Sequence, residues 1–162
     1  NISEEELAGM LYENSDEPYC EELAKAITTE IRKGNRIDTT TKLRNVIEKT
    51  LDFLPNNKEK KDIIKKTCQR TFQALRIDVN NEFEVLYEFM EKLPGALKPG
   101  GRVAILTFHS GEDKLVKKAL KAGYKEGIYS EYARDVVRPS AQECAQNGRA
   151  RSTKMRWAVK AE

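Results

Sequence analysis

The sequence predicts an α/β chain in which an all-helical amino-terminal unit precedes part of an open sheet. Apolar residues recur at helical spacing through the first 70 residues, and no strand-like run occurs among them. An apolar run at 102–108 follows Pro99-Gly100-Gly101, as buried strands of open parallel sheets do. Near the end of the sequence, Met155, Trp157 and Val159 alternate with polar or small residues, which indicates a half-buried strand. On it we expect Trp157 to be core, and the alternative is a platform for base stacking.

The first two helices are marked by their ends. Ser3 and Glu6 have the spacing of a capping box, and apolar residues follow on one helical face. Pro18 suits the first turn of a second helix, which Gly34 closes.

Two further helices are expected before the sheet. Either Thr39 or Thr40 caps the third. A helical stretch from about Lys58, with an unbroken apolar stripe from Phe72 to Leu93, predicts one long fourth helix. Beyond about residue 70 helices and strands alternate. We therefore expect two domains, a helical one at 1–70 and a mixed one at 71–162.

The elements after the first strand are shorter. Leu115 to Leu120 indicates a helix that Gly123 ends, and a strand is expected to end at Val136-Val137. Pro139-Ser140 then begins a turn or short helix. No repeat or low-complexity tract interrupts this order.

Composition narrows the class of protein. No apolar run approaches the ~20 residues that span a bilayer, and no signal peptide is expected, so membrane partners are not expected. Three widely spaced cysteines and a single histidine favour a reducing compartment and no metal site. Because the sequence begins with Asn1, we expect it to be a trimmed piece.

The charge is distributed unevenly. Residues 1–55 hold 12 acidic and 7 basic side chains, whereas residues 112–162 hold 7 acidic and 12 basic. The densest basic run lies between Asn147 and Arg156. It is either a solvated surface loop or a phosphate-binding segment, in which cations supply affinity and orientation without reading sequence.

Polar side chains gather where the first strand ends. Phe108, His109, Ser110, Glu112 and Asp113 lie at the carboxyl end of the strand, where open sheets bind their ligands. The alternative is structural: Phe108 is core, Ser110 caps the next helix, and the two carboxylates complement its positive end.

Four groups of residues resemble the MraW/RsmH family, in the order in which that family has them: Thr71 to Asn80, Pro99 to Arg102, Phe108 to Lys114, and Pro139-Ser140 with Asn147 to Arg156. The resemblance implies a Rossmann-like methyltransferase sheet. It also implies S-adenosylmethionine-dependent methylation of the N4 amine of a cytidine in small-subunit ribosomal RNA. Glu22–Ile27 and Thr39–Leu43 are similar to the family's helical insertion, so the match covers its later part.

The resemblance also implies roles for particular residues. A target cytosine must leave its stack, lie against apolar surface and have its amine oriented by acceptors, for which the cluster after the strand is the best candidate. Arg76 and Asn80 flank the apolar stripe of the long helix, either as ligands or in a hydrogen-bond network between helix and loop. We expect these catalytic residues: His109, Ser110 and Asp113. We expect these substrate-binding residues: Arg76, Asn80, Phe108, Glu112, Asn147, Arg149, Arg151, Ser152, Lys154 and Arg156.

The sequence departs from the family in three places. Gly111 and Gly148 stand where the family commonly has a larger apolar residue and a proline. No glycine-rich turn follows a strand, because Gly100-Gly101 precedes one. S-adenosylmethionine is therefore expected as the cofactor of the parent protein, with no cofactor-binding residue in this chain.

Two competing functions remain open. The chain could be a non-catalytic RNA-binding or ribosome-associated module, or a helical protein-interaction domain built on residues 1–70. A strand and glycine-rich turn encoded upstream of Asn1 would favour the enzyme. Expected partners are ribosomal RNA or the small ribosomal subunit, with a homodimer left open. The expected location is the cytoplasm, or else a chloroplast or mitochondrion.

Overall fold

Helix-capping residues fix where the elements of the first part of the chain begin. In the computed structural model, which describes residues 2–162, Ser3 Oγ accepts a hydrogen bond from the Glu6 backbone N–H (3.1 Å). The Glu6 carboxylate accepts one from the Ser3 N–H (2.8 Å), which confirms the predicted capping box. Thr39 and Asn57 cap two later helices in the same way.

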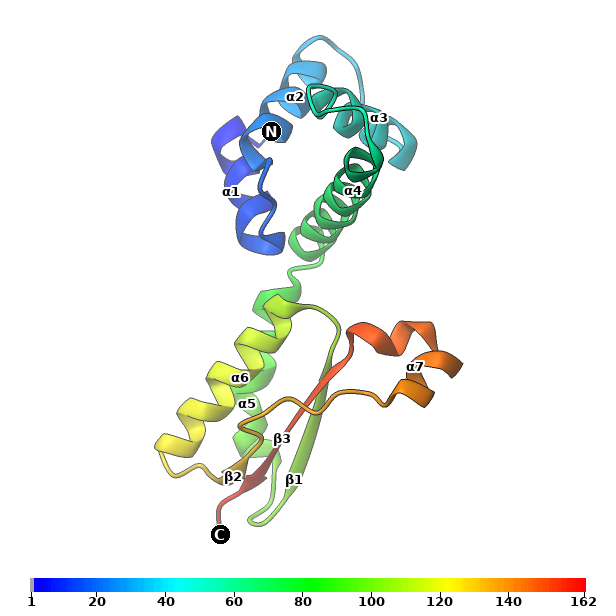
Figure 1. Cartoon of the computed structure of the whole chain (residues 1–162). Helices are drawn as coiled ribbons and strands as arrows, with labels where there is room; N and C mark the ends of the chain where they lie inside the picture. Colours follow the sequence, from blue (N-terminus) through cyan, green and yellow to red (C-terminus); the bar gives the residue numbers. More distant parts are fainter. Residues whose placement is uncertain (1) are drawn as a thin grey trace. The chain divides into compact units, whose positions relative to one another are not determined.

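The chain forms two units, divided between Glu82 and Phe83 (Figure 1). Unit 1 contains four helices: α1 (Glu4–Ser15), α2 (Cys20–Arg32), α3 (Thr40–Thr50) and α4 (Lys58–Val79). The remaining elements are α5 (Glu82–Ala96), β1 (Arg102–Thr107), α6 (Ser110–Lys125), β2 (Tyr129–Tyr132), α7 (Ala141–Gln146), the 3-10 helix η1 (Gly148–Ser152) and β3 (Lys154–Lys160). From Phe83 onward they make up unit 2. No helix among the described residues is both long and apolar enough to cross a membrane.

Unit 1 is held together by apolar faces of its four helices. Leu11, Leu23, Ile47 and Leu51 are completely buried in its core. Burial of such side chains contributes roughly 1.5–3 kcal/mol each to folding. The second half of α4 packs on α1, so the domain boundary expected at 70–71 falls inside a helix of this unit.

The predicted long helix from Lys58 to Leu93 is wrong, because the structure has two helices there. Helix α4 stops at Val79, and Asn81 adopts a positive φ of 49°. Asparagine tolerates this left-handed conformation better than other side chains. The apolar spacing continues across the break, which is why periodicity alone missed it.

Unit 2 is built on a three-stranded sheet in the order β1-β3-β2. Strand β3 is antiparallel to both neighbours, with Arg102 opposite Val159 and Thr107 opposite Lys154. One face of the sheet packs against α5 and α6. That core contains Met90, Leu93, Val116 and Leu120, with Val103 and Ile105 of β1 packed against it.

The opposite face of the sheet carries Trp157 of β3, which was predicted to be core. Residues Arg156 and Ala158 are the buried ones on this strand, while Met155, Trp157 and Val159 are only half-buried. The last three line an open groove of about 480 Å³ together with Ala104 of β1. The alternation was predicted correctly, but the face assignment was wrong.

One glycine assignment also changes. Gly123 lies inside α6, where a Cβ would come within 2.6 Å of the Tyr129 ring, so it permits close packing and does not end the helix. Gly127, with φ 75°, follows the helix end. The strand expected at Val136-Val137 is β2 at Tyr129–Tyr132, and Val137 forms only one bridge, to Met155.

Candidate functional site

His109 occupies the junction between β1 and α6 and caps the helix with its imidazole. Its backbone is extended (φ −138°), and Nδ1 accepts a hydrogen bond from the Glu112 N–H (3.4 Å). The Glu112 carboxylate turns back and accepts a hydrogen bond from the Phe108 N–H (2.9 Å). The alternative in which Ser110 caps this helix is wrong, since Ser110 is its first helical residue and is exposed.

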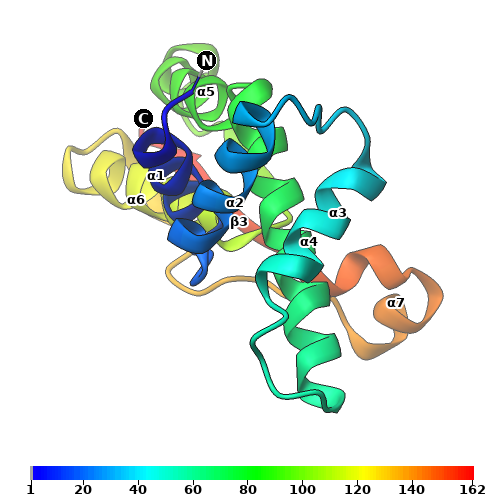
Figure 2. The ribbon, with the colours of Figure 1, turned by 90° about the horizontal axis from the view of Figure 1, so that it is seen from above.

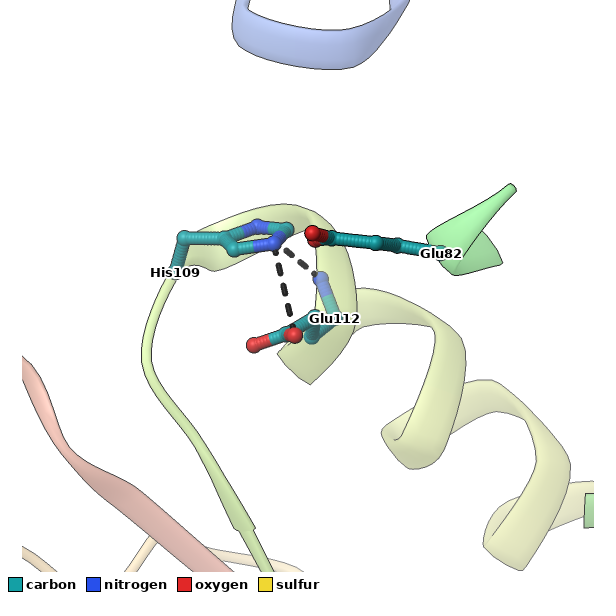
Figure 3. A group of neighbouring side chains, drawn as sticks. All are labelled: Glu82, His109 and Glu112. Carbon is teal, nitrogen blue, oxygen red and sulfur yellow. Dashed lines mark hydrogen bonds and ion pairs between the residues drawn. The ribbon is translucent and has the colours of Figure 1, made fainter. Parts of the chain in front are cut away.

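The cap fixes the tautomer of the neutral imidazole. Because Nδ1 accepts, the ring proton of neutral His109 is on Nε2. That atom lies 3.5 Å from Oε1 of Glu112, and the two side chains lie close together in Figure 3. The His109 side chain is only 10% exposed, so its ring is held in place.

Phe83 holds the other side of this junction. Its ring meets the His109 ring edge to face, with centroids 5.9 Å apart. A Cβ on Gly111 would come within 2.7 Å of the Phe83 ring. From the sequence, Phe83 was assigned only to an apolar stripe. Gly111, which precedes Glu112, is the sequence signal that a bulky side chain lies close to this turn.

Phe108 and Glu112 offer groups that a flat ligand can use. Phe108 is 55% exposed, so the alternative that its ring is part of the core is wrong. A nearby carboxylate and imidazole can accept hydrogen bonds from an amine, and an exposed ring can stack on a base. The structure therefore places four of the expected residues together here: Phe108, His109, Ser110 and Glu112.

Asp113 and Arg156 pair with one another. Arg156 Nε donates to Oδ1 of Asp113 (2.7 Å) and Nη2 donates to Oδ2 (3.1 Å), while Nη1 donates to the carbonyls of Ala133 and Arg134 (3.4 Å each). Both residues are buried, and Lys154 Nζ lies 3.9 Å from Oδ2.

This pairing defines the electrostatics of the two side chains. The hydrogen bonds from Arg156 hold the pKa of Asp113 below its usual range, against the opposing effect of burial. Arg156 was expected to contact phosphate, but its guanidinium is occupied and the residue is 5% exposed. That assignment is corrected to a structural one. A catalytic role for Asp113 stays a prediction.

The α7–η1 segment presents cations to solvent. Asn147 Oδ1 accepts a hydrogen bond from the Arg149 N–H (3.1 Å) and so begins η1, while Ala150 is buried beneath it. Arg149 and Arg151 on either side are exposed, as is Ser152. The anchored turn therefore aims two guanidinium groups outward, as a phosphate-binding segment requires.

Arg76 and Asn80 lie in unit 1, where both contact Glu82. Arg76 donates to the Glu82 carboxylate through Nε (2.8 Å) and Nη2 (3.1 Å), and Asn80 Nδ2 lies 3.5 Å from Oε1. This is the hydrogen-bond network that the sequence left open as an alternative to a ligand role. The three residues link the end of α4 to the start of α5.

The residues present do not form a cradle for S-adenosylmethionine. Among the described residues, β1 leads directly into the His109 cap, and β2 leads into an irregular segment without glycine. Such a cradle needs a glycine-rich turn after a strand, so that backbone N–H groups can approach the ligand. No chemical step through this cofactor is therefore derived from the chain.

Similar proteins fall in one family. The family model described as the MraW methylase family matches residues 1–161. The chain is 89% identical over its whole length to a ribosomal RNA small subunit methyltransferase H 1 of Agathobacter rectalis, of which it covers 46%. It is 70% identical over 99% of its length to the protein of that name in Lachnoclostridium phytofermentans, of which it covers 43%. The chain thus spans a little under half the length of these relatives, and it belongs to the MraW methylase family.

Proposed function

We propose that this chain supplies the RNA-facing part of an S-adenosylmethionine-dependent methyltransferase that modifies the N4 amine of a cytidine in small-subunit ribosomal RNA. The observation that carries the proposal is the 89% identity, over every residue of the chain, with a relative named as a ribosomal RNA small subunit methyltransferase. We expect the cofactor to be held by residues outside this chain, because no glycine-rich turn follows a strand among residues 2–162.

The proposed target base lies at the β1–α6 junction. Phe108 offers an exposed ring for stacking, and the Glu112 carboxylate, fixed by the Phe108 N–H, offers an acceptor for the exocyclic amine. His109 orients the carboxylate and closes one side of the site. Positioning of this kind is worth up to ~7–11 kcal/mol of a barrier when the reacting groups are well aligned.

The proposed RNA backbone contacts come from the α7–η1 segment. Arg149 and Arg151 are exposed and are held on a turn whose first residue, Asn147, is locked by its own side chain. Ser152 can add a hydrogen bond, whereas the largely buried Lys154 lies beside the Asp113 carboxylate and adds only nearby positive charge. The proposed partner is the small ribosomal subunit or its RNA. The proposed location is the bacterial cytoplasm, in keeping with the bacterial relatives.

A chimaera tests the proposal directly. The matching segment of the Agathobacter rectalis relative is replaced by this chain, and the unaltered relative is the control. Small subunits from cells that lack the activity are incubated with isotopically labelled S-adenosylmethionine, and their nucleosides are separated. We expect label in N4-methylcytidine. Absence of label, or label on another atom, would contradict the proposal, and RNA binding without label would favour the non-catalytic module.

A further inference from the structure

Charges of opposite sign occupy different helices of unit 1. Residues 2–31 include nine acidic and one basic side chain, whereas residues 32–70 include twelve basic and five acidic. The acidic segment forms α1 and α2, and the basic segment forms α3 and the first half of α4. Figures 1 and 2 both show α3 and the start of α4 on the side of this unit away from α1. Unit 1 therefore has one strongly basic side.

Four of the cations on that side have carboxylate partners. Lys60 pairs with Asp52 and Arg70 with the buried Glu17. On α3, Lys42 and Arg44 are also paired. A second group on the outward face of α4 is exposed and forms no ion pair among residues 2–162: Lys58, Lys61, Lys65 and Lys66. We call these four residues the α4 lysine face.

This arrangement lowers the stability of the helix that carries it. The first turn of α4 contains Lys58, Lys60 and Lys61 with only Glu59 as an acid, at the positive end of the helix dipole, where acids are favoured. Lys61 and Lys65 are four residues apart, so like charges are adjacent on the helix surface. The exposed Asp62 lies four residues from both Lys58 and Lys66 and offsets only part of this cost. A face that merely solvates the protein would gain stability from acids at these positions.

A polyanion removes that cost by neutralising the lysines. The four side chains are spread over about 12 Å of helix, which allows contact with successive groups along an extended anionic chain. Thr67, Thr71 and Ala74 are buried farther along the same helix, so the lysine face stands on a rigid element. Release of counterions from a nucleic acid backbone would supply the binding free energy.

We propose that the α4 lysine face is a second RNA-binding surface, which contacts the sugar–phosphate backbone outside the modified nucleotide. The identity of this RNA as small-subunit ribosomal RNA rests on the proposed function, whereas the backbone contact itself does not. The surface adds affinity and orientation without reading sequence.

The test compares two charge-matched quadruple variants of the whole chain. The first is Lys58→Gln, Lys61→Gln, Lys65→Gln and Lys66→Gln. The control removes four exposed lysines of α6: Lys117→Gln, Lys118→Gln, Lys121→Gln and Lys125→Gln. Fluorescence anisotropy of a labelled small-subunit rRNA fragment gives affinity across a series of salt concentrations. We expect the first variant to bind on the order of tenfold more weakly or worse, with a salt slope flatter by up to ~0.7–0.9 per lost contact, and the control to change little.

Several results would overturn the inference. One is an equal loss of affinity in both variants, which would mean that net charge alone matters. Another is unchanged RNA binding by the first variant. A third is that the four substitutions weaken binding to phosphatidylserine vesicles but not to RNA, which would indicate a membrane-binding surface. Circular dichroism checks that α4 still forms. If helicity falls, the unaltered chain is acetylated at its lysines with and without RNA instead. We expect RNA to protect the α4 lysines from acetylation and to leave the α6 lysines reactive, and equal reactivity of both sets would overturn the inference.

Failure here is distinguishable from failure of the proposed function. A chimaera that transfers no methyl group, in a protein whose α4 lysines are protected by RNA, removes the enzyme proposal and leaves the surface. A chimaera that methylates cytidine normally after the four α4 substitutions, with unchanged RNA affinity, removes the surface and leaves the enzyme.

Discussion

Arg156 on β3 and Asp113 in the first turn of α6 form a buried, two-pronged ion pair, with Nε–Oδ1 at 2.7 Å and Nη2–Oδ2 at 3.1 Å. Asp113 follows His109 by one helical turn, and its N–H donates to the His109 carbonyl (3.3 Å). The pair therefore fastens the turn that carries His109 and Glu112 to the neighbouring strand. Its first consequence is structural, because both charges are removed from water together.

Breaking this pair should destabilise the chain strongly. Asp113→Asn leaves the Arg156 guanidinium buried without its counterion, for which we expect a loss of about 3–5 kcal/mol in the free energy of unfolding. Replacing both partners, with Asp113→Leu and Arg156→Met, removes both buried charges and should cost far less. Urea denaturation of the single and double variants measures this. A double variant as unstable as the single one would show that packing, and not the ion pair, is responsible.

The same pair predicts how stability depends on pH. The pKa of Asp113 is lowered in the folded chain, chiefly by the hydrogen bonds from Arg156. Its contribution is therefore fully present above the unfolded value of about 3.9 and is lost as the pH falls through the lower, folded value. Urea midpoints measured below about pH 4 should fall steeply for the unaltered chain and less steeply for Asp113→Asn. Parallel curves would rule out this carboxyl as the titrating group.

Local signals in the sequence predicted the starts of the helices in unit 1 correctly. Ser3, Glu6 and Thr39 act on backbone groups within a few residues, so their capping roles could be predicted from spacing alone. The burial of Arg156 depends on a carboxylate 43 residues earlier, which no local pattern reveals. An arginine in a basic run was accordingly interpreted as a phosphate contact.

Hydrophobic periodicity gave wrong predictions where two different structures have the same apolar spacing. The apolar spacing of α4 continues into α5, so only Asn80 and the left-handed Asn81 separate the helices. On β3, Trp157 alternates with Arg156, and hydrophobicity favoured the tryptophan as the inward residue. The structure buries Arg156 because its ion pair and carbonyl contacts satisfy the guanidinium. The grouping of polar side chains after β1 was still predictable, since a strand must deliver its last residues to the edge of the sheet.

The close approach of Phe83 to Gly111 predicts a coupled pair. Gly111→Ala would bring a methyl group within 2.7 Å of the Phe83 ring, so we expect it to lower the unfolding temperature. In a Phe83→Leu background the same substitution should cost less, because the ring edge is gone. A double-mutant cycle from thermal unfolding measures the coupling. Additive effects would mean that the helix backbone, and not the ring, resists the methyl group.

The exposed arginines of η1 should carry part of the RNA affinity. Arg149→Ala with Arg151→Ala should weaken binding of small-subunit rRNA and flatten its salt dependence by up to two contacts, at ~0.7–0.9 each. Lys118→Ala with Lys121→Ala on α6 is the matched control, since it removes the same charge from another exposed surface. Filter binding across a salt series measures both. If the salt dependence of RNA affinity changes equally in the two variants, the η1 arginines contribute only through the net charge of the chain.

His109 has two roles to separate, because its imidazole caps α6 and also borders the proposed base site. His109→Ala removes the acceptor for the Glu112 N–H and should cost about 0.5–2 kcal/mol of stability. His109→Asn restores a good capping side chain but has no imidazole, so it should unfold at nearly the temperature of the unaltered chain. If the imidazole contacts the target base, both variants lose single-turnover methylation in the chimaera, while only the alanine variant loses stability. Normal turnover by His109→Asn would assign His109 to capping alone.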